Sequence, residues 1–398
     1  MSGRRRSRVA LTMIVRDDES LLPGCLGSTR GLFDEIVVVD TGSVDGSREV
    51  ARSFGARVVD YPWCDDFSAA RNMAISHCAC DSIFWMDADE ALSPSARGRL
   101  ARLLKHGVER NAVYMMYQVS NRLDGSFGFT EIPSPRLFGY RHGVSWSGRV
   151  YERILPSLRA AGRKITAVNI HIGHTGFAQA SSVMRKLSRN KRLLEIELAE
   201  VPSDPRVLFN LAFTHSMMGR CASLEEVGTA QRYLGQMLDR GHDPIDPELK
   251  ARAQRLQSGN HYYLHNMIDA LRICRDGRSS SPTDVGLVDL EAFLLRDLGM
   301  WDEAEALYNG LPRIREYIKS IHLVPERYVA LVSAKIEAAY YFEEVNKYCK
   351  AFAMWIDLAR NSAGMFDALP GVRRTARRVL RKAVFHPRAF LDEIGHFR

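Results

Sequence analysis

The chain of 398 residues is 46% hydrophobic and 26% charged, with a formal net charge of +8. These values are ordinary for a soluble globular protein of one or two domains. No apolar stretch approaches the ~18 residues of a membrane-spanning helix, which argues against a membrane-embedded class. The moderate positive charge would help to attract an anionic substrate.

The N-terminus is basic and is followed by a short apolar run, Val9–Val15. Because this run lacks a small-residue cleavage site, it is interpreted as a first strand and not as a signal peptide. Seven cysteines, an odd number without a framework spacing, indicate reduced thiols and a cytoplasmic location.

The first ninety residues alternate between apolar runs and helix-compatible stretches. Such alternation predicts an α/β domain with a mostly parallel sheet and helices on its faces. Ser43 or Asp45 is expected to cap the second helix and Gly55 to end it. The expected strands are Ala10–Val15, Glu35–Val39, Ala56–Val59 and Ser82–Met86, and the expected helices are Ser20–Arg30, Asp45–Phe54 and Phe67–Cys78.

Polar and mainly acidic residues follow each predicted strand. One acidic turn is weak evidence, because Asp is common in loops. Ligands of parallel sheets, however, bind beyond the carboxyl ends of the strands, so four such ends together predict a site. The segments are Arg16–Glu19, Asp40–Ser43, Asp60–Tyr61 and Asp87–Glu90.

The segment "IFWMDADEAL" places Asp87, Asp89 and Glu90 within four residues. These carboxylates repel one another, so a positive partner is expected at the strand end. Oxygen ligands suit a hard divalent cation, Mg²⁺ or Mn²⁺, that keeps positions open for substrate phosphates. The alternative is that Asp89 or Glu90 caps the following helix.

Beyond the first domain, residues 115–168 are expected to form short strands and turns, and the chain is expected to turn helical after about Ser181. The segment "LEAFLLRDLGMWDEAEALYNGL" resembles one half of a paired-helix repeat, with a turn at Gly299–Trp301. Asp276–Thr283 is the best candidate for an internal loop. We therefore expect a first domain over residues 1–195 and a helical domain over residues 196–398.

The C-terminal region contains seven basic residues separated by apolar residues at helical spacing. A basic amphipathic helix with a solvated face is favoured, and peripheral contact with a membrane surface or an anionic acceptor is left open. Nucleic-acid binding is disfavoured because few aromatic residues are interleaved. The basic residues are Arg373, Arg374, Arg377, Arg378, Arg381, Lys382 and Arg388.

Several segments, in this order and spacing, resemble the family 2 glycosyltransferases of the GT-A fold, which have a Rossmann-like nucleotide-diphospho-sugar transferase domain. These segments are "MIVRDDE", "DEIVVVDTGSVDGSREVA", "WCDDFSAARNMA" and "IFWMDADEAL". The later "IHIGHTGF" and "MRKLSRNKRLLEIELAEVPSDPRVLFNLA" are similar to the branch that carries tetratricopeptide-like (TPR-like) helices and includes glycosyltransferases of bacteriocin peptides. The resemblance implies a GT-A domain followed by an all-α helical-repeat domain.

The resemblance also implies a set of donor-binding residues. The family usually has Lys-Asn-Glu where this chain has Arg16-Asp17-Asp18, which leaves the nucleotide open. A guanidinium in the "AARN" segment suits phosphate contact. The implied roles are Asp40 on the uridine, Asp17 and Asp18 along its pocket, Arg71 and Asn72 on the nucleotide or its phosphates, Asp87 near the ribose or metal, and Asp89 on the metal.

In "WSGRVYERI", Glu152 takes the place of the family's general base, and Tyr151 takes the place of a histidine. A surface ion pair of Glu152 with Arg149 or Arg153 is the alternative. His171, in "NIHIGH", matches a family histidine and would complete the metal shell; the alternative is a structural histidine.

The main hypothesis is therefore an inverting, metal-dependent transferase that moves a sugar from a UDP-sugar to an acceptor. A Ser, Thr or Cys side chain of a peptide is one acceptor, because helical-repeat surfaces suit extended peptides. A saccharide, a lipid and a small natural product are the others. A second hypothesis is a non-enzymatic interaction protein with an inert transferase half. Because tandem-helix arrays often pair with themselves, a homodimer is left open.

Overall fold

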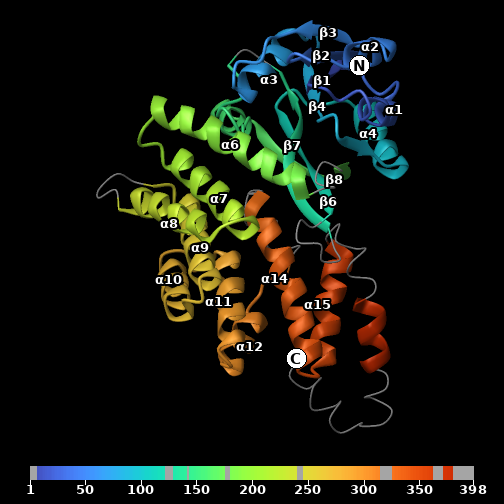
Figure 1. Ribbon diagram of the computed structural model, residues 1–398. Coiled ribbons are helices and arrows are strands. Elements are labelled where there is room, and N and C mark those ends of the chain that lie inside the picture. Colours follow the sequence, from blue (N-terminus) through green and yellow to red (C-terminus); the bar gives the residue numbers. More distant parts are fainter. Residues whose placement is uncertain are drawn as a thin grey trace. The chain divides into compact units, whose positions relative to one another are not determined.

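A computed structural model describes residues 7–121, 129–140, 143–174, 180–239, 245–313, 325–361 and 371–379. The chain forms two compact units. The first unit comprises residues 1–123 and 132–210, and the second comprises residues 124–131 and 211–398 (Figure 1). The predicted boundary at residues 195/196 stays a prediction.

The first unit is built on an eight-stranded mixed sheet with the order β3-β2-β1-β4-β7-β6-β8-β5. The four N-terminal strands pair in parallel, as the sequence predicts. β7 runs antiparallel to β4, and β8 runs parallel to β6. The strands are β1 Val9–Val15, β2 Glu35–Asp40, β3 Arg57–Asp60, β4 Ser82–Trp85, β5 Glu90–Leu92, β6 Ala112–Asn121, β7 Phe129–Gly139 and β8 Lys164–His174.

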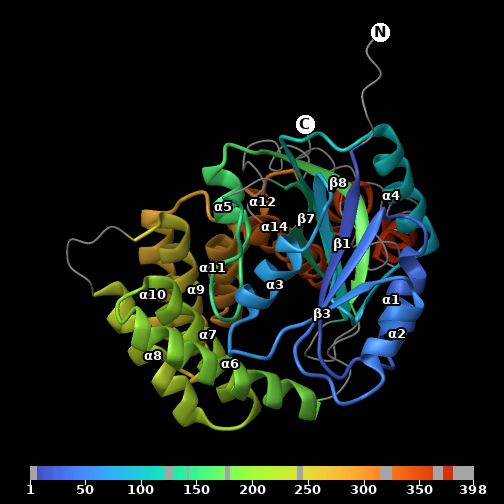
Figure 2. The same cartoon turned by 90° about the horizontal axis from the view of Figure 1, so that it is seen from above.

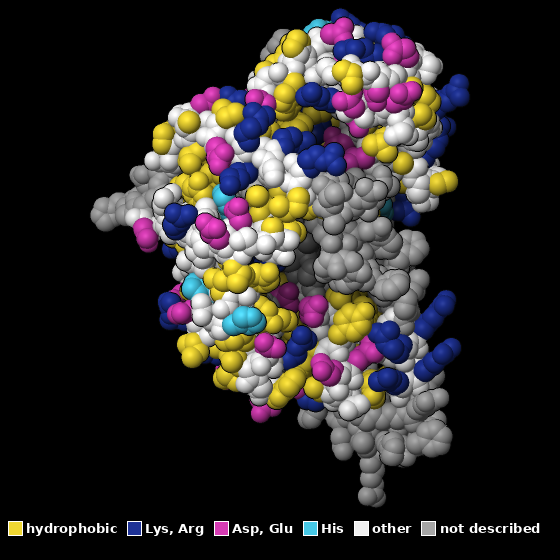
Figure 3. All heavy atoms as spheres, in the orientation of Figure 1, with side chains coloured by type: hydrophobic (Ala, Val, Ile, Leu, Met, Phe, Trp, Pro, Cys, Tyr) yellow, Lys and Arg dark blue, Asp and Glu magenta, His cyan; other side chains and the backbone are white. Residues whose placement is uncertain are grey.

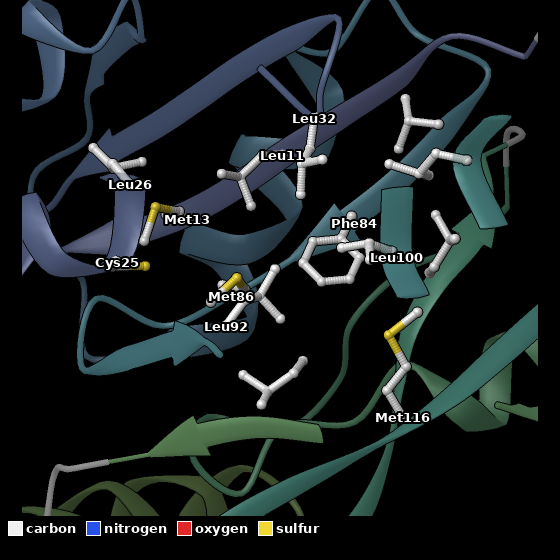
Figure 4. Close-up of a cluster of buried hydrophobic side chains, with 14 of the residues drawn as sticks. Leu11, Met13, Cys25, Leu26, Leu32, Phe84, Met86, Leu92, Leu100 and Met116 are labelled. Carbon is white, nitrogen blue, oxygen red and sulfur yellow. The ribbon is translucent and has the colours of Figure 1, made fainter. Parts of the chain in front are cut away.

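Helices cover both faces of the parallel strands (Figure 2). Leu11 and Met13 of β1 pack with residues of α1, α2 and α4 in one core (Figure 4). Val39 of β2 packs with Ala70 and Ala74 of α3 in a second cluster. Alternate residues of a buried strand therefore pack on opposite faces of the sheet, because successive side chains of a strand point to opposite sides. The helices are α1 Leu22–Thr29, α2 Ser47–Ser53, α3 Phe67–Ser76, α4 Pro94–His106, α5 Leu155–Ala160 and α6 Ala180–Glu200.

Local sequence signals set most helix ends. Asp66 accepts a hydrogen bond from the Ala69 N–H (3.0 Å) and caps α3, as N-cap aspartates do. Gly55 follows α2 with φ = +80°, as expected of a helix-ending glycine. The N-cap position of α2 is Gly46, and neither Ser43 nor Asp45 occupies it. Asp45 nevertheless accepts the N–H of Ser47, the first residue of α2, through Oδ1 (3.0 Å).

The expectation of short strands over residues 115–168 is wrong. β6, β7 and β8 have 10, 11 and 11 residues. Tight turns and glycines suggested breaks, but β6 and β8 continue past an irregularity in their pairing between Met115 and Tyr117. A β-bulge of this kind bends a strand without ending it.

The second unit is helical, as predicted. α9 packs against α10, α11 against α12, and α14 against α15. The predicted turn at Gly299–Trp301 is confirmed between α11 and α12, with Trp301 as the first residue of α12. Ala251, Cys274 and Leu287 form part of a core shared by α9, α10 and α11. The helices are α7 Pro205–Cys221, which begins in the first unit, α8 Leu224–Leu238, α9 Pro247–Tyr263, α10 Met267–Ser280, α11 Val285–Asp297, α12 Trp301–Asn309, α14 Pro325–Glu344 and α15 Tyr348–Asn361.

The predicted loop Asp276–Thr283 is wrong over its first five residues, which belong to α10. Gly277 lies where an added Cβ would approach Leu287 to 3.1 Å, so its small size lets α10 and α11 pack closely. The Ser279 and Ser280 hydroxyls donate to main-chain carbonyls one turn earlier. The small and polar residues that suggested a loop therefore serve a helix.

Of the predicted basic C-terminal helix, residues 371–379 are described and are helical, and its remainder lies outside the described residues. Arg374 pairs with Glu343, so part of the charge is structural. On the face shown in Figure 3, basic and acidic side chains are interspersed. No helix in the described part of the chain is long and apolar enough to cross a membrane. All seven cysteines are free thiols.

Asp289 of α11 is half-buried, and its buried Oδ1 atom has no hydrogen-bond partner among the described residues. Burial, reinforced by the charge of Glu337, raises the pKa of Asp289 to about 7. The native state therefore binds this proton more tightly than the unfolded state does. Stability should fall as pH rises from about 4 to about 7.

We predict that Asp289→Asn stabilises the protein at alkaline pH. The free energy of unfolding of the variant should exceed that of the wild type by a margin that grows by about 2–3 kcal/mol between about pH 5 and pH 8. The margin grows because only the wild type must ionise a buried group. Calorimetric unfolding across this range measures the gap. Asp276→Asn, at an exposed position, is the control, and an equal pH dependence in both variants would contradict the assignment.

Candidate active site

The register of the parallel strands aligns their carboxyl ends. Val15, Asp40 and Asp60 lie side by side at the ends of β1, β2 and β3. Thr12 of β1 lies beside Trp85, the last residue of β4, so the loop that follows β4 opens at the same edge. The acidic segments predicted from sequence therefore belong to one edge of the sheet.

The loop after β1 is joined to the loop after β2 by main-chain hydrogen bonds. The N–H groups of Asp17 and Asp18 donate to Ser43 Oγ (3.0 Å) and Ser47 Oγ (2.8 Å). In return, the N–H group of Val44 donates to Asp17 Oδ1 (2.8 Å). The carboxylate of Asp17, whose backbone has φ = +56°, thus holds the two loops together.

A second exchange strengthens this junction. The Glu19 N–H donates to Asp45 Oδ2 (3.1 Å), and the Gly46 N–H donates to Glu19 Oε2 (2.9 Å). A Cβ atom on Gly46 would lie 2.7 Å from the Glu19 carboxyl carbon, so a larger residue would have to push the Glu19 carboxylate away from the Gly46 N–H.

Asp18, in contrast, faces the acidic part of the site. Its carboxylate accepts the Arg16 N–H (3.1 Å). Burial raises the pKa of Asp18 to about 6, and the charges of Asp89, Asp45 and Asp87 add to the shift. The edge of the sheet therefore retains excess negative charge at this position.

Asp40 ends β2 with its side chain fully buried. Its Oδ1 atom accepts the N–H groups of Gly42 and Ser43 (both 3.0 Å) and contacts Arg48 (2.7 Å). Its Oδ2 atom has no hydrogen-bond partner in the described part of the chain. A buried carboxylate oxygen without a donor is costly, and a ligand N–H group would satisfy it.

Each of the three carboxylates that follow β4 has its own positively charged or chargeable partner. The predicted positive partner was a divalent cation, which stays a prediction, and the structure places side chains of the protein beside all three carboxylates. The distances are 2.9 Å for Asp87–Arg71, 3.3 Å for Asp89–His174 and 2.6 Å for Glu90–Arg136.

The pair between Glu90 and Arg136 is fully buried on both sides. Two nitrogens of Arg136 contact the two oxygens of Glu90, and the Arg136 guanidinium lies 3.8 Å from the Trp85 ring centroid. Glu90 Oε2 also accepts the Asp87 N–H (2.9 Å). This pair therefore fixes the backbone of the acidic loop and is not part of its surface.

Arg71 of α3 joins the acidic loop to a distant segment. It contacts Asp87 Oδ1 through Nη2 (2.9 Å) and Glu152 Oε1 through Nε (2.7 Å). Burial by itself would lower the pKa of Arg71, but the two carboxylates outweigh it and raise the pKa. Glu152 is thus paired with a buried arginine, and Arg149, one of the alternatives, pairs with Glu200.

Asn72, the next residue on α3, fixes the same distant segment. Its amide donates to the Trp146 carbonyl (3.0 Å) and accepts the Trp146 N–H (2.8 Å). Between Trp146 and Glu152, Tyr151 adopts a positive φ of +53°, which is uncommon for a bulky residue and typical of functional turns.

Two histidines of β8 differ in their surroundings. His174 Nε2 lies 3.3 Å from Asp89 Oδ2, whereas His171 stacks on the Tyr117 ring at 5.3 Å. Burial alone would lower the pKa of His174, but its hydrogen bond to Asp89 and the nearby charges raise it. The geometry favours His174 over the predicted His171 as the histidine that acts with Asp89.

The donor set suits a divalent cation only with outside ligands. Among the described residues, no three His, Cys, Asp or Glu side chains gather into a complete metal site. Asp89 and His174 offer one carboxylate oxygen and one imidazole nitrogen. The pKa of Asp18 is raised mainly by burial and further by the nearby carboxylates of Asp89, Asp45 and Asp87. These residues fit a cation whose remaining positions are filled by substrate oxygens.

Sequence reasoning missed Arg136, His174, Arg48 and Trp146. A second histidine in "IHIGH" was a usable signal for His174. Arg136 and Arg48 had none, because an arginine in a strand or on a helix is usually a surface residue. Their roles depend on which strands and loops become neighbours.

Comparison with known proteins shows what the first part of the chain resembles. Residues 11–156 match the model of glycosyl transferase family 2, so this part of the chain is similar to that family. The chain is 33% identical over 247 residues to a TPR repeat-containing protein of Synechococcus elongatus, covering 60% of this chain and 58% of the relative. It is 26% identical over 200 residues to the SPbeta prophage-derived glycosyltransferase SunS of Bacillus subtilis, covering 50% of this chain and 46% of SunS.

The chain thus spans about half the length of these two relatives. Among solved structures, TarS 1–349 of S. aureus in complex with UDP-GlcNAc has 14% identity and a TM-score of 0.40, covering 69% of this chain and 91% of that chain. The mannosyltransferase PcManGT of Pyrobaculum calidifontis, in complex with GDP-Man and Mn²⁺, has 16% identity and a TM-score of 0.38, covering 69% and 88%.

We predict that Arg136→Met lowers the free energy of unfolding of the first unit by about 3–5 kcal/mol, because it leaves Glu90 buried without a cation. Glu90→Leu combined with Arg136→Met should recover part of this loss. Calorimetry measures both. Arg99→Met, at an exposed position, is the control, and equal melting temperatures of the two single variants would refute the role of the pair.

Proposed function

We propose that the protein is an inverting, metal-dependent glycosyltransferase that uses a UDP-sugar. The observation that carries this proposal is the linked set Asp87–Arg71–Glu152, which joins the acidic strand end to a second carboxylate. Transfer of an activated sugar needs a group that binds the donor and a base that takes the acceptor's proton. Buried Arg71 contacts Asp87, the candidate for the donor-binding group, and Glu152, the candidate for the base.

The donor side is proposed along the ends of β1, β2 and β4. The unpartnered Asp40 Oδ2 supports a contact with an imide N–H, the group that uracil offers. Asp18 would line the pocket. Asp17 would stabilise one side of the pocket through its hydrogen bond from the Val44 N–H. Asp87 would face the ribose. Asn72 is bound to Trp146 and would hold the segment that carries Glu152, not the donor.

Asp89 and His174 would hold a divalent cation, Mn²⁺ or Mg²⁺. When bound, such a cation would stabilise the charge that develops on the leaving diphosphate. The protein's own task is to keep these two side chains together, and Glu90 and Arg136 serve it by fixing the loop that carries Asp89.

Glu152 would act as the general base. Its carboxylate takes the proton of an acceptor hydroxyl or thiol while the acceptor atom bonds to the anomeric carbon. The bond between that carbon and the diphosphate oxygen breaks, and the diphosphate leaves with the electron pair. Attack from the face opposite the leaving group inverts the configuration.

The proposed acceptor is a Ser, Thr or Cys side chain of a peptide. The second unit supports this choice, because its helical pairs form the kind of array that binds extended peptides. A saccharide, a lipid or a small natural product is the alternative acceptor for the same chemistry.

We predict that Glu152→Gln lowers sugar transfer by about 10²–10⁴-fold and leaves UDP binding unchanged. Wild type with UDP-glucose or UDP-N-acetylglucosamine and Mn²⁺ should bind and hydrolyse or transfer the donor, as mass spectrometry measures. Glu49→Gln, at an exposed position, is the control. If wild type neither binds nor consumes any UDP-sugar, the proposed function fails.

We also predict that Asp89→Asn and His174→Ala each weaken Mn²⁺ binding in the presence of UDP by about 10–100-fold. Paramagnetic resonance of Mn²⁺ measures this without turnover. His171→Ala is the comparison: a loss confined to His171→Ala would restore His171 as the ligand, as the family resemblance implied.

A further inference from the structure

Arg71 lies in an unusually closed setting for a residue expected to contact nucleotide phosphates. Its side chain is only 9% exposed. Its guanidinium lies 4.7 Å from the Trp85 ring centroid and 5.0 Å from that of Trp146. Its Nε and Nη2 atoms are both engaged by carboxylates.

Both aromatic rings are themselves fixed. The Trp85 indole N–H donates to the Pro135 carbonyl (2.6 Å), and the Trp146 backbone is bonded to Asn72. The rings meet edge to face at 5.1 Å. The two carboxylates therefore engage two of the three guanidinium nitrogens, and the two rings lie beside the group.

Each of the two carboxylates contacts Arg71 through only one of its oxygens. Glu152 binds through Oε1, and its Oε2 atom has no hydrogen-bond partner within the described ranges. Asp87 binds through Oδ1. Arg71 thus separates two negative charges that would otherwise repel, and it sets the direction of the oxygen that is left to react.

We propose that Arg71 is a positioning residue that orients Glu152 relative to Asp87, and that it does not contact the donor diphosphate. Asn72 assists by holding the backbone of the Trp146–Glu152 segment. This inference rests on the proposed function of Glu152 as the base. Arg71 and Asn72, which are adjacent in the "AARN" segment, would then both position the base that acts on the acceptor.

The two roles for Arg71 predict different kinetics. A positioning residue acts through Glu152, so its loss lowers kcat and leaves the KM for the donor nearly unchanged. A small misplacement of a reacting group costs about 10²-fold in rate. A phosphate contact binds the ground state as well, so its loss would raise the donor KM and weaken UDP binding.

The test compares Arg71→Gln, Arg71→Lys, Glu152→Gln and the double variant Arg71→Gln with Glu152→Gln. We expect kcat of Arg71→Gln to fall about 10²-fold with donor KM and UDP affinity within about threefold. The double variant should lose no more than Glu152→Gln alone, because residues that act as a unit are not additive. Arg71→Lys keeps the charge without the fork and should recover only part of kcat.

Arg97→Gln, whose guanidinium binds the Ser28 and Arg30 carbonyls away from the site, is the matched control. If Arg71→Gln does not fold, Asn72→Ser carries the test, since it removes the Trp146 bonds without altering a charge and should lower kcat alone. A raised donor KM, weaker UDP binding or additive losses would overturn the inference. An inactive wild type would instead refute the proposed function.

Discussion

The site depends on separate neutralisation of three carboxylates at one strand end. Asp87, Asp89 and Glu90 lie within four residues, and bringing them together in a partly buried loop would be prohibitive without nearby positive charge. Glu90 is the innermost, and its fully buried pair with Arg136 anchors the loop backbone. Asp87 and Asp89 can then face outward.

The positively charged or chargeable partners come from three different elements, so the site exists only when these elements meet. Arg71 lies on α3, Arg136 on β7 and His174 at the end of β8. β7 pairs directly with β4, and β8 pairs with the short β5 that contains Glu90. The length of these late strands therefore matters to function, because it carries Arg136 and His174 to the acidic loop.

The arrangement of the first ninety residues was predicted well from the sequence. The parallel strands, the intervening helices and the acidic strand ends follow from local apolar patterns and from the rule that carboxyl ends of parallel strands share an edge. Glu152 was selected as the base, and Arg71 was selected as a site residue, through the family resemblance. In the structure Arg71 contacts both Asp87 and Glu152, while the roles of Arg71 and Glu152 stay proposals.

The pairing of the later strands, which include β7 with Arg136 and β8 with His174, could not be predicted in the same way. Antiparallel and mixed pairing depends on contacts between distant segments, and no local signal indicates that Arg136 faces Glu90 across the sheet. His171 and His174 lie three residues apart in β8, so their side chains fall on opposite faces of the strand. His174 lies beside Asp89, and the role of His171 as a metal ligand stays a prediction. Glycine and serine near residue 280 suggested a loop, yet packing between helices used their small size.

The junction between the loops after β1 and β2 has a consequence for how tightly a nucleotide can be held. Reciprocal hydrogen bonds, with Gly46 seated against Glu19, make these two loops one preformed wall. A ligand that docks against such a wall does not have to order it first, so less of its binding enthalpy is offset by lost chain entropy. In the proposed donor site, affinity for the base would then reflect its fit to the buried Asp40 more than any closure of the loops around it.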